Sequence, residues 1–168
     1  MTGTLYFWRE TEEAGWLSQW YPYAFHDDTD PSIIYKTAEH YMMYHKAILF
    51  KDLAVALTIL KAHHPREVKN LGRKVKNFNQ DTWVKHREDI VTKGTLLKFT
   101  KPVNDEGLKE KLLATGDQDI VEASPYDRIW GIGFTEKHAE DVRDDWGLNL
   151  LGKSIMMVRT QLREDAKA

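Results

Sequence analysis

The chain has 168 residues, 42% of them hydrophobic and 30% charged, and a net charge of −2. This size and composition predict one folded domain over residues 1–168, and the net charge by itself requires neither nucleic acid nor an anionic membrane as a partner. The sequence has no cysteine, which excludes disulfides, thiol catalysis and thiolate metal sites. Its first residues have neither a basic region nor a long apolar run, so we expect no signal peptide. No segment approaches about 20 apolar residues, so we expect an intracellular protein, cytoplasmic or nuclear, without a membrane span.

In chain order, short β-forming runs stand before and after a series of helical segments. The first strand is expected at residues 4–8, and a loop rich in acidic residues and proline follows it, with a short strand at 23–25. Another strand is expected at residues 119–124, and after a turn residues 129–134 are expected to form either a strand or an extended loop. Apolar periodicity predicts helices over residues 35–50, 53–62, 65–75, 82–99, 105–116 and 149–162.

Several residues suit the ends of these helices. Asp52, Asp81 and Asn149 are expected as N-caps, and Pro65 fits a first helical position. Gly94 is expected to mark a break in its helix. Because helices dominate and the few strands lie at the start of the chain and around residues 119–134, we expect an α+β fold, a mainly helical single domain with a small β-sheet.

The stretch "YKTAEHYMMYHKAILF", residues 35–50, places two charges where apolar side chains are expected. At about 100° per residue, Glu39 and Lys46 fall inside the arc formed by Tyr35, Met43 and Phe50. One interpretation is a structural ion pair, or a lysine that extends to water at the domain edge. The other is a cleft, where burial lowers the pKa of a lysine and raises that of a carboxyl for use as nucleophile, acid or base.

The stretch "VEASPYDRIWGIG", residues 121–133, is a second candidate. Asp127 follows a Ser-Pro turn, where a carboxylate either faces a pocket or closes the turn by accepting bonds from backbone N–H groups. Glu122 lies in the middle of the expected strand and gives one strand face a carboxylate. The "GIG" run has neither a phosphate-loop lysine nor a following helix, so it is not a nucleotide-binding fingerprint.

Five lysines and arginines lie within residues 66–76. Lys69, Arg73 and Lys76 share one helical face, which is either a solvated surface or a site for phosphates. No metal-binding or serine-hydrolase motif occurs, and we expect neither a metal nor an organic cofactor. From the residues alone, the reaction class stays open.

Five motifs occur in one order along the chain: "GWLSQWYP", "YKTAEHYMMYHKAILFKD", "KFTKP", "LLATGDQDIVEASPYDRIWGIG" and "NLLGKSIMMVR". Together they resemble the NADAR, or YbiA-like, family over nearly the whole chain, from about Tyr6 to Arg163. Two positions depart from the family pattern. Gln19 stands where the family usually has Asn, which is expected to change a ligand hydrogen bond, and "WGLNLLG" lacks a proline that the family usually has after the tryptophan, which is expected to alter a loop.

The resemblance implies an N-glycosidase, a hydrolase that cleaves the bond between ribose C1 and an exocyclic amine. Its expected substrate is guanine that carries ADP-ribose on its exocyclic amino group, in DNA or RNA. One alternative is a small ribosylated substrate, a ribosylamino-pyrimidine intermediate of riboflavin biosynthesis. Another is a non-catalytic ADP-ribose-binding module. The oligomeric state is not indicated.

Carried over by position, the resemblance implies three catalytic residues. Lys46 is expected to attack C1 and form a Schiff base, or to stabilise negative charge, and Glu39 to act as acid or base toward the ribose or the leaving amine. Asp127 is expected to orient a ribose hydroxyl or to activate water. Tryptophans are expected to stack on the base or enclose the sugar. The expected substrate-binding residues are Trp20, Trp83, Trp130, Ser18, Glu122 and Asn149.

Overall fold

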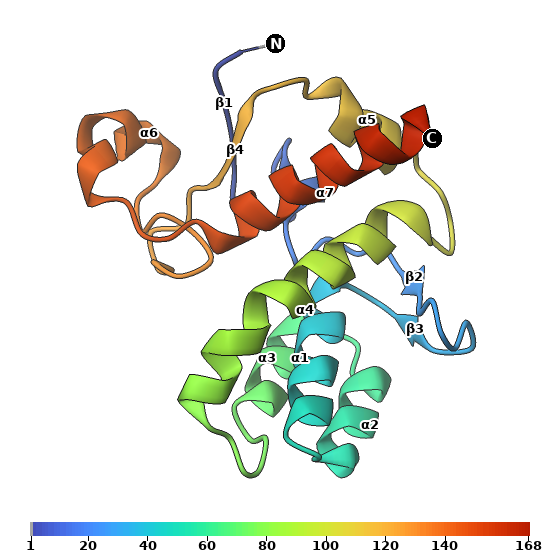
Figure 1. The fold of residues 1–168 in the computed structure, drawn as a ribbon. Coiled ribbons are helices and arrows are strands. Elements are labelled where there is room, and N and C mark those ends of the chain that lie inside the picture. The colour runs from blue at the N-terminus through green and yellow to red at the C-terminus, as the bar shows by residue number, and fades with distance from the viewer. Residues whose placement is uncertain (1) are drawn as a thin grey trace. The chain divides into compact units, whose positions relative to one another are not determined.

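The computed structural model describes residues 2–168, whose helices and strands are shown in Figure 1. The chain divides into two compact units. Unit 1 combines residues 1–21 with residues 106–168, and unit 2 is the continuous stretch 22–105. Each helix within the described residues is too short or too polar to cross a membrane.

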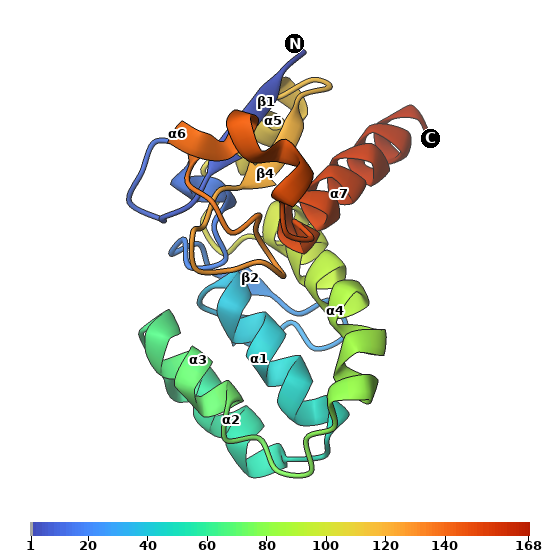
Figure 2. The same cartoon turned by 90° about the vertical axis from the view of Figure 1, so that its left-hand side faces the viewer.

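Unit 2 is a group of helices with a short hairpin. Its elements are β2 (Phe25–His26), β3 (Ile34–Tyr35), α1 (Ala38–Leu49), α2 (Leu53–Lys61), α3 (Pro65–Gly72) and α4 (Gln80–Thr100). The two strands are antiparallel. α1 contacts each of the other three helices, as the two views in Figures 1 and 2 show. This central helix carries two of the predicted catalytic residues.

Side-chain caps determine where the first helices of unit 2 begin. Thr37 caps α1 by accepting a hydrogen bond from the N–H of His40 (3.3 Å). Tyr35 therefore lies outside the helix that was expected to include it, and belongs to β3. Asp52 caps α2 as predicted, since its Oδ1 accepts from the N–H of Val55 (3.2 Å).

α4 differs from the prediction in two respects. Its cap is Asn79, which accepts from the N–H of Thr82 (2.9 Å), so the prediction of Asp81 as the cap is wrong and Asp81 lies inside the first turn. Gly94 does not break the helix. A Cβ at this position would lie 3.0 Å from Cε1 of Tyr41, so the glycine allows α4 to approach α1 closely.

The hydrophobic core of unit 2 forms where α1 and α4 meet the hairpin. Phe25, Tyr35, Ala38, Tyr41 and Leu97 are each at most 5% exposed. The three aromatic rings contact one another with centroids 4.8–6.1 Å apart. Such burial stabilises by about 25 cal/mol per Å² of apolar surface, and it fixes the position of α1.

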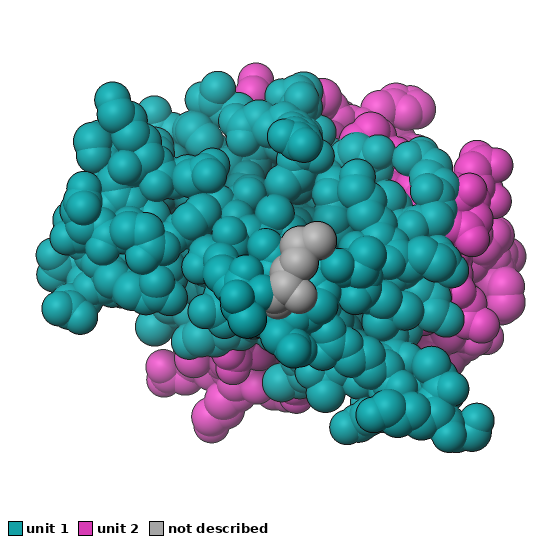
Figure 3. All heavy atoms as spheres, turned by 90° about the horizontal axis from the view of Figure 1, so that it is seen from above, with its two compact units in different colours: residues 1–21, 106–168 teal, residues 22–105 magenta. Residues whose placement is uncertain are grey.

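Unit 1, coloured teal in Figure 3, is built on two parallel strands. β1 (Thr4–Phe7) pairs with β4 (Asp119–Glu122). Its other elements are η1 (Gly15–Leu17), α5 (Leu108–Ala114), α6 (Glu136–Ala139), η2 (Glu140–Asp145) and α7 (Leu150–Lys167). α7 packs on β4, and α5 packs on α7. The predicted α+β class, mainly helical with little sheet, is confirmed, although the strands form two separate two-stranded sheets.

The segment 129–134 was expected to be a strand or an extended loop, and the structure shows an irregular loop. The carbonyl groups of residues 128–131 accept hydrogen bonds from the N–H groups of residues 148–151 at 2.8–3.1 Å. These donors lie at the start of α7, where N–H groups have no partner within the helix. The loop therefore satisfies the first turn of α7 instead of extending a sheet. α7 also runs past its predicted end at residue 162.

Candidate active site

Unit 2 holds Lys46 half-buried against aromatic rings. Its Nζ lies 4.6 Å from the ring centroid of Phe78 and 5.5 Å from that of Trp83. Burial lowers the pKa of Lys46; the charge of Glu39 raises it, and the nearby cation Arg73 lowers it further. Because ring faces attract an ammonium group, the aromatic contacts also hold the charged form in place.

Glu39 lies on the same helix about two turns before Lys46. Its side chain is buried, with the residue 5% exposed. The charge of Glu39 acts on Lys46, so the two groups share one electrostatic environment, in agreement with their placement on one side of the helical wheel. A buried carboxyl group beside a half-buried amine can exchange protons with a bound molecule and present a nucleophile to it.

Two aromatic residues border Lys46, and only one of them was predicted. Trp83, on α4, is 8% exposed. Phe78 lies in the polar loop before α4, is 42% exposed and contacts Phe50 with ring centroids 5.3 Å apart. The signal for Phe78 in the sequence is a single aromatic residue between two asparagines, which does not reveal which way the ring turns.

Lys98 is a second lysine of chemical interest, and the sequence interpretation did not single it out. It lies on α4, is 3% exposed, and burial lowers its pKa to about 7. Its neighbours Leu97 and Phe99 are also buried. The signal was present in the sequence as a lysine inside the apolar run "LLKF", within the "KFTKP" motif.

On unit 1, Asp127 closes the turn that follows β4. Its Oδ1 accepts hydrogen bonds from the N–H groups of Ile129 (2.9 Å) and Trp130 (2.8 Å). The turn-closing interpretation of this residue is therefore realised. Both bonds use the same oxygen, so Oδ2 is not committed to the turn, and a role of Asp127 toward a substrate stays a prediction.

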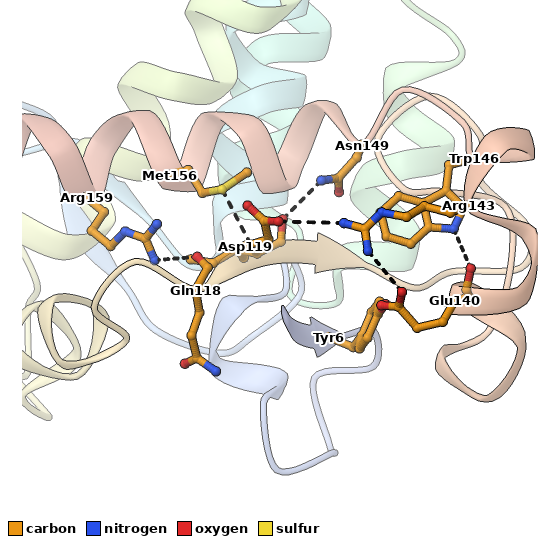
Figure 4. A network of polar contacts seen from close by, with 11 residues as sticks. Tyr6, Gln118, Asp119, Glu140, Arg143, Trp146, Asn149, Met156 and Arg159 are labelled. Carbon is orange, nitrogen blue, oxygen red and sulfur yellow. Dashed lines mark hydrogen bonds and ion pairs between the residues drawn. The ribbon is translucent and has the colours of Figure 1, made fainter. Parts of the chain in front are cut away.

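Asn149 links the start of α7 to β4 (Figure 4). It has a left-handed backbone conformation with φ of 50°. Its Oδ1 accepts from the N–H of Glu122 (3.0 Å), and its Nδ2 donates to the carbonyl of Ile120 (3.0 Å). Asn149 is the N-cap residue of α7, as predicted, but its side chain makes no capping bond. Its amide instead holds β4 in place.

Glu122 lies against the loop that contains Trp130. Its Oε2 is buried, and a Cβ added at Gly131 would lie 3.0 Å from this oxygen and 2.7 Å from the Glu122 carbonyl oxygen. The N–H of Ile132 donates to that same carbonyl (3.0 Å). Trp130 is half-buried in this loop. Glu122, Asp127 and Trp130 thus come from one compact turn.

A charged network next to this turn attaches η2 to the sheet (Figure 4). Arg143 forms ion pairs with Glu140 (3.0 Å) and Asp119 (3.7 Å), and the hydroxyl of Tyr6 donates to Glu140. Burial and then this hydrogen bond raise the pKa of Tyr6 to about 12. Because the ion pairs are exposed, they position η2 rather than add much stability.

Ser18 and Trp20 lie together just after η1 in unit 1. Ser18 is buried, and its Oγ accepts from the N–H of Trp20 (3.1 Å). Trp20 is half-buried. Of the predicted site residues, unit 2 carries Glu39, Lys46 and Trp83. Unit 1 carries Ser18, Trp20, Glu122, Asp127, Trp130 and Asn149.

The chemistry that these groups can perform is acid–base and amine chemistry. Within residues 2–168, no three histidine, aspartate or glutamate side chains are grouped so that they could hold a metal ion. The carboxyl of Glu39 can donate or accept a proton, and the amine of Lys46 can attack an electrophilic carbon when it is neutral. The lowered pKa of Lys46 increases its neutral fraction near pH 7.

Comparison with known proteins identifies the family. The NADAR domain model matches residues 6–163. N-glycosidase R617 of Acanthamoeba polyphaga mimivirus is 44% identical over 149 residues, which are 86% of each chain. Riboflavin biosynthesis protein VVA0006 of Vibrio vulnificus is 29% identical over 166 residues, which are 99% of this chain and 40% of that protein. The NMR structure of E. coli YbiA shares the fold, with a TM-score of 0.76 at 24% identity over 99% of this chain and 89% of that one. The chain therefore belongs to the NADAR domain family and is an N-glycosidase.

Proposed function

We propose that the chain removes ADP-ribose from the exocyclic amine of guanine in nucleic acid by hydrolysing the bond between that amine and ribose C1. One observation carries the proposal: Lys46 is half-buried against Phe78 and Trp83 and lies within the electrostatic reach of the buried Glu39. Cleavage of an N-glycoside requires a proton for the leaving nitrogen and a nucleophile for C1. A carboxyl and an amine with lowered pKa on one helix supply both.

The proposed reaction begins with attack of the neutral Lys46 amine on C1. As the new C–N bond forms, the bond from C1 to the guanine amine breaks, its electron pair stays on that nitrogen, and the Glu39 carboxyl donates a proton to it. The Glu39 carboxylate then removes a proton from the lysine nitrogen. The Glu39 carboxyl passes this proton to the ring oxygen as the bond from C1 to that oxygen breaks and the lysine nitrogen forms a double bond to C1. The product is a protonated Schiff base between C1 and Lys46.

Hydrolysis of this Schiff base completes the reaction. Water adds to C1, the bond to the lysine nitrogen breaks, and the sugar is released with a free anomeric hydroxyl after its ring closes. One water molecule is consumed for each bond cleaved. We assign Asp127 to a ribose hydroxyl or to this water, because its Oδ1 bonds to two backbone N–H groups and so fixes the orientation of the carboxylate.

The first test is a single-turnover assay on an oligonucleotide that bears ADP-ribosyl guanine. We expect Lys46→Ala and Glu39→Gln each to lower the rate by about 100-fold or more, the usual contribution of a positioned acid, base or nucleophile, without changing the melting temperature. Lys46→Arg keeps the charge but removes the nucleophile, so it distinguishes covalent attack from charge stabilisation. Normal turnover by both of the first two variants would show that the site is elsewhere.

Borohydride trapping then identifies the amine. Reduction of the Schiff base during turnover is expected to attach the sugar to Lys46, and peptide mass spectrometry locates the adduct. Lys98 is the internal comparison, because burial lowers its pKa to about 7. An adduct on Lys98 and none on Lys46 would transfer the nucleophile role to α4.

A second candidate substrate is a ribosylamino-pyrimidine intermediate of riboflavin synthesis. The observation that favours it is the similarity to a riboflavin biosynthesis protein over 99% of this chain. Both substrates have ribose C1 bonded to an exocyclic nitrogen, so the same groups could act on either. The test presents both substrates to one enzyme preparation and compares kcat/KM, which measures discrimination in the transition state.

A further inference from the structure

The segment from the end of α2 through α3 has a charge unlike that of the chain as a whole. Residues 61–76 contain six lysines and arginines and one acidic residue, Glu67, which gives the segment a net charge of +5 in a chain with a net charge of −2. All six cations are exposed. Lys69, Lys74 and Lys76 take no part in the ion pairs found within residues 2–168. Their charges therefore face solvent.

The cations follow α3 along its length. Arg66, Lys69 and Arg73 recur at i, i+3 and i+7 and so lie on one side of the helix over about 10 Å. Val68 and Gly72 form the buried side. On the flank next to Arg66 there is an open pocket of about 540 Å³, lined by His64, Arg66, Glu67, Asn70, Leu71 and Lys74.

This basic surface begins beside the candidate nucleophile. Gly72 packs so closely on Met43 of α1 that a Cβ would overlap the Met43 sulfur. Arg73, the next residue, is near enough to Lys46 to influence its protonation. A molecule whose sugar lies at Lys46 would therefore find the cations of α3 next to it.

We propose that the basic α3 surface, formed by Arg66, Lys69, Arg73 and Lys74, binds the phosphate backbone of the nucleic-acid strand that carries the modified guanine. The inference rests on the proposed function and specifies how its substrate is held. Phosphates of one strand follow one another at about 3.4 Å along the axis of a duplex, so about 10 Å of basic surface matches about three phosphates. The single diphosphate of ADP-ribose would need a shorter basic surface.

A lipid surface is a poorer match for the same cations. Helices that lie on membranes combine a basic face with large apolar side chains that enter the lipid. On α3 and its two caps, none of the exposed residues is a large hydrophobic residue; they are His64, Arg66, Glu67, Lys69, Asn70 and Arg73. The charge pattern without apolar anchors therefore favours a polynucleotide.

The experiment measures binding of a fluorescent, unmodified single-stranded oligonucleotide by anisotropy over a series of salt concentrations. The test variant carries Lys69→Glu and Lys74→Glu, and the matched control carries Lys85→Glu and Lys137→Glu, two exposed lysines on other helices that give the same change in net charge. We expect the test variant to lose about tenfold or more in affinity. The slope of log K against log salt should fall by about 1.4, or about 0.7 for each phosphate contact.

Equal affinity of the test and control variants for the oligonucleotide would overturn the inference. A loss of binding by the test variant that appears only with vesicles of phosphatidylcholine and phosphatidylserine would overturn it as well. Turnover separates this result from the proposed function. The test variant should hydrolyse ADP-ribosyl guanosine, which has no strand, at the wild-type rate, but should be slower on limiting oligonucleotide. Equal slowing on both substrates would assign the cations to the diphosphate and contradict a strand contact. If the wild-type protein hydrolyses neither substrate, the proposed function fails, and the anisotropy result still decides on the strand contact.

Discussion

At the scale of single residues, two opposite charges act on the pKa of Lys46. Burial lowers its pKa first, Glu39 raises it and Arg73 lowers it. In Arg73→Ala, the pKa of Lys46 should rise toward its ordinary value, so less neutral amine is present at pH 7 and the rise in single-turnover rate with pH should move to higher pH. The measurement is the single-turnover rate constant at saturating enzyme between about pH 6 and pH 10. Arg73→Lys keeps the charge and serves as control, and an unmoved profile in Arg73→Ala would rule out deprotonation of Lys46 as the controlling step.

Part of the candidate site could be predicted from the sequence because a helix fixes which residues are neighbours. The 3.6-residue period put Glu39 and Lys46 on one side of α1, and their electrostatic coupling agrees with it. Phe78 could not be predicted, because it follows Asn77, whose backbone is left-handed with φ of 58°, and tertiary contacts decide where such a loop side chain turns. The lowered pKa of Lys98 could not be predicted, because it results from burial, and burial depends on how the helices pack.

At the scale of elements, the contact between β4 and the following loop depends on a glycine, which has no side chain. A Cβ at Gly131 would approach the Glu122 carbonyl oxygen to 2.7 Å, and a backbone atom cannot move aside as a flexible side chain can. We expect Gly131→Ala to reduce the free energy of unfolding by about 1–3 kcal/mol, as overpacking usually does. Urea unfolding measures this change. A loss below about 0.5 kcal/mol would mean that the loop can shift without consequence.

The two hydrogen bonds between Asn149 and β4 allow a second test of how the elements are held together. Asn149→Ala removes the partner of the Glu122 N–H and of the Ile120 carbonyl, so we expect unfolding to become easier by about 1–3 kcal/mol. Asn149→Gly also removes both bonds but tolerates the left-handed backbone. The difference in unfolding free energy between the two variants therefore measures the cost of this backbone conformation for alanine. If the two variants were as stable as the wild type, the amide would not link α7 to β4.

Helices were easier to predict than their ends and the loops around them. Asp52 caps α2 because a capping bond is local, within reach of three residues. The cap of α4 moved from Asp81 to Asn79 because both residues suit the position and packing decides between them. The segment 129–134 has β-forming residues, but the carbonyl groups of residues 128–131 accept hydrogen bonds from the start of α7. This partner lies about twenty residues away in the chain, so local patterns cannot show it.

At the scale of the whole molecule, buried cationic groups make stability depend on pH. Burial lowers the pKa of His40 and His45 below the ordinary 6.5, so the stability present above pH 6.5 is lost as pH falls below it. Lys98 has its pKa lowered from 10.5 to about 7, and between these values the unfolded chain binds a proton that the folded chain does not. Both effects have the same sign, so stability should rise with pH from below 6.5 to about 10.

Thermal melting at constant ionic strength measures this dependence. The slope should be at most about 1.4 kcal/mol per pH unit for each group. Lys98→Met should flatten the part above pH 7, because the group that titrates there is gone. The rise should end near pH 10, because the raised pKa values of Tyr6, Tyr35 and Tyr41 reverse the sign above the ordinary value of 10.0. A melting temperature that is independent of pH would show that these groups are hydrated in the folded state.

The parallel pairing of β1 with β4 has a consequence for synthesis of the chain. Thr4 pairs with Asp119, so β1 leaves the ribosome long before its partner strand is made, whereas unit 2 is one uninterrupted stretch. Contacts between residues distant in sequence form late, because a long loop must close before they stabilise anything. The helices around α1 can therefore assemble during translation while β1 still has an unpaired edge, and this strand is the segment that a chaperone would need to shield until β4 has been made.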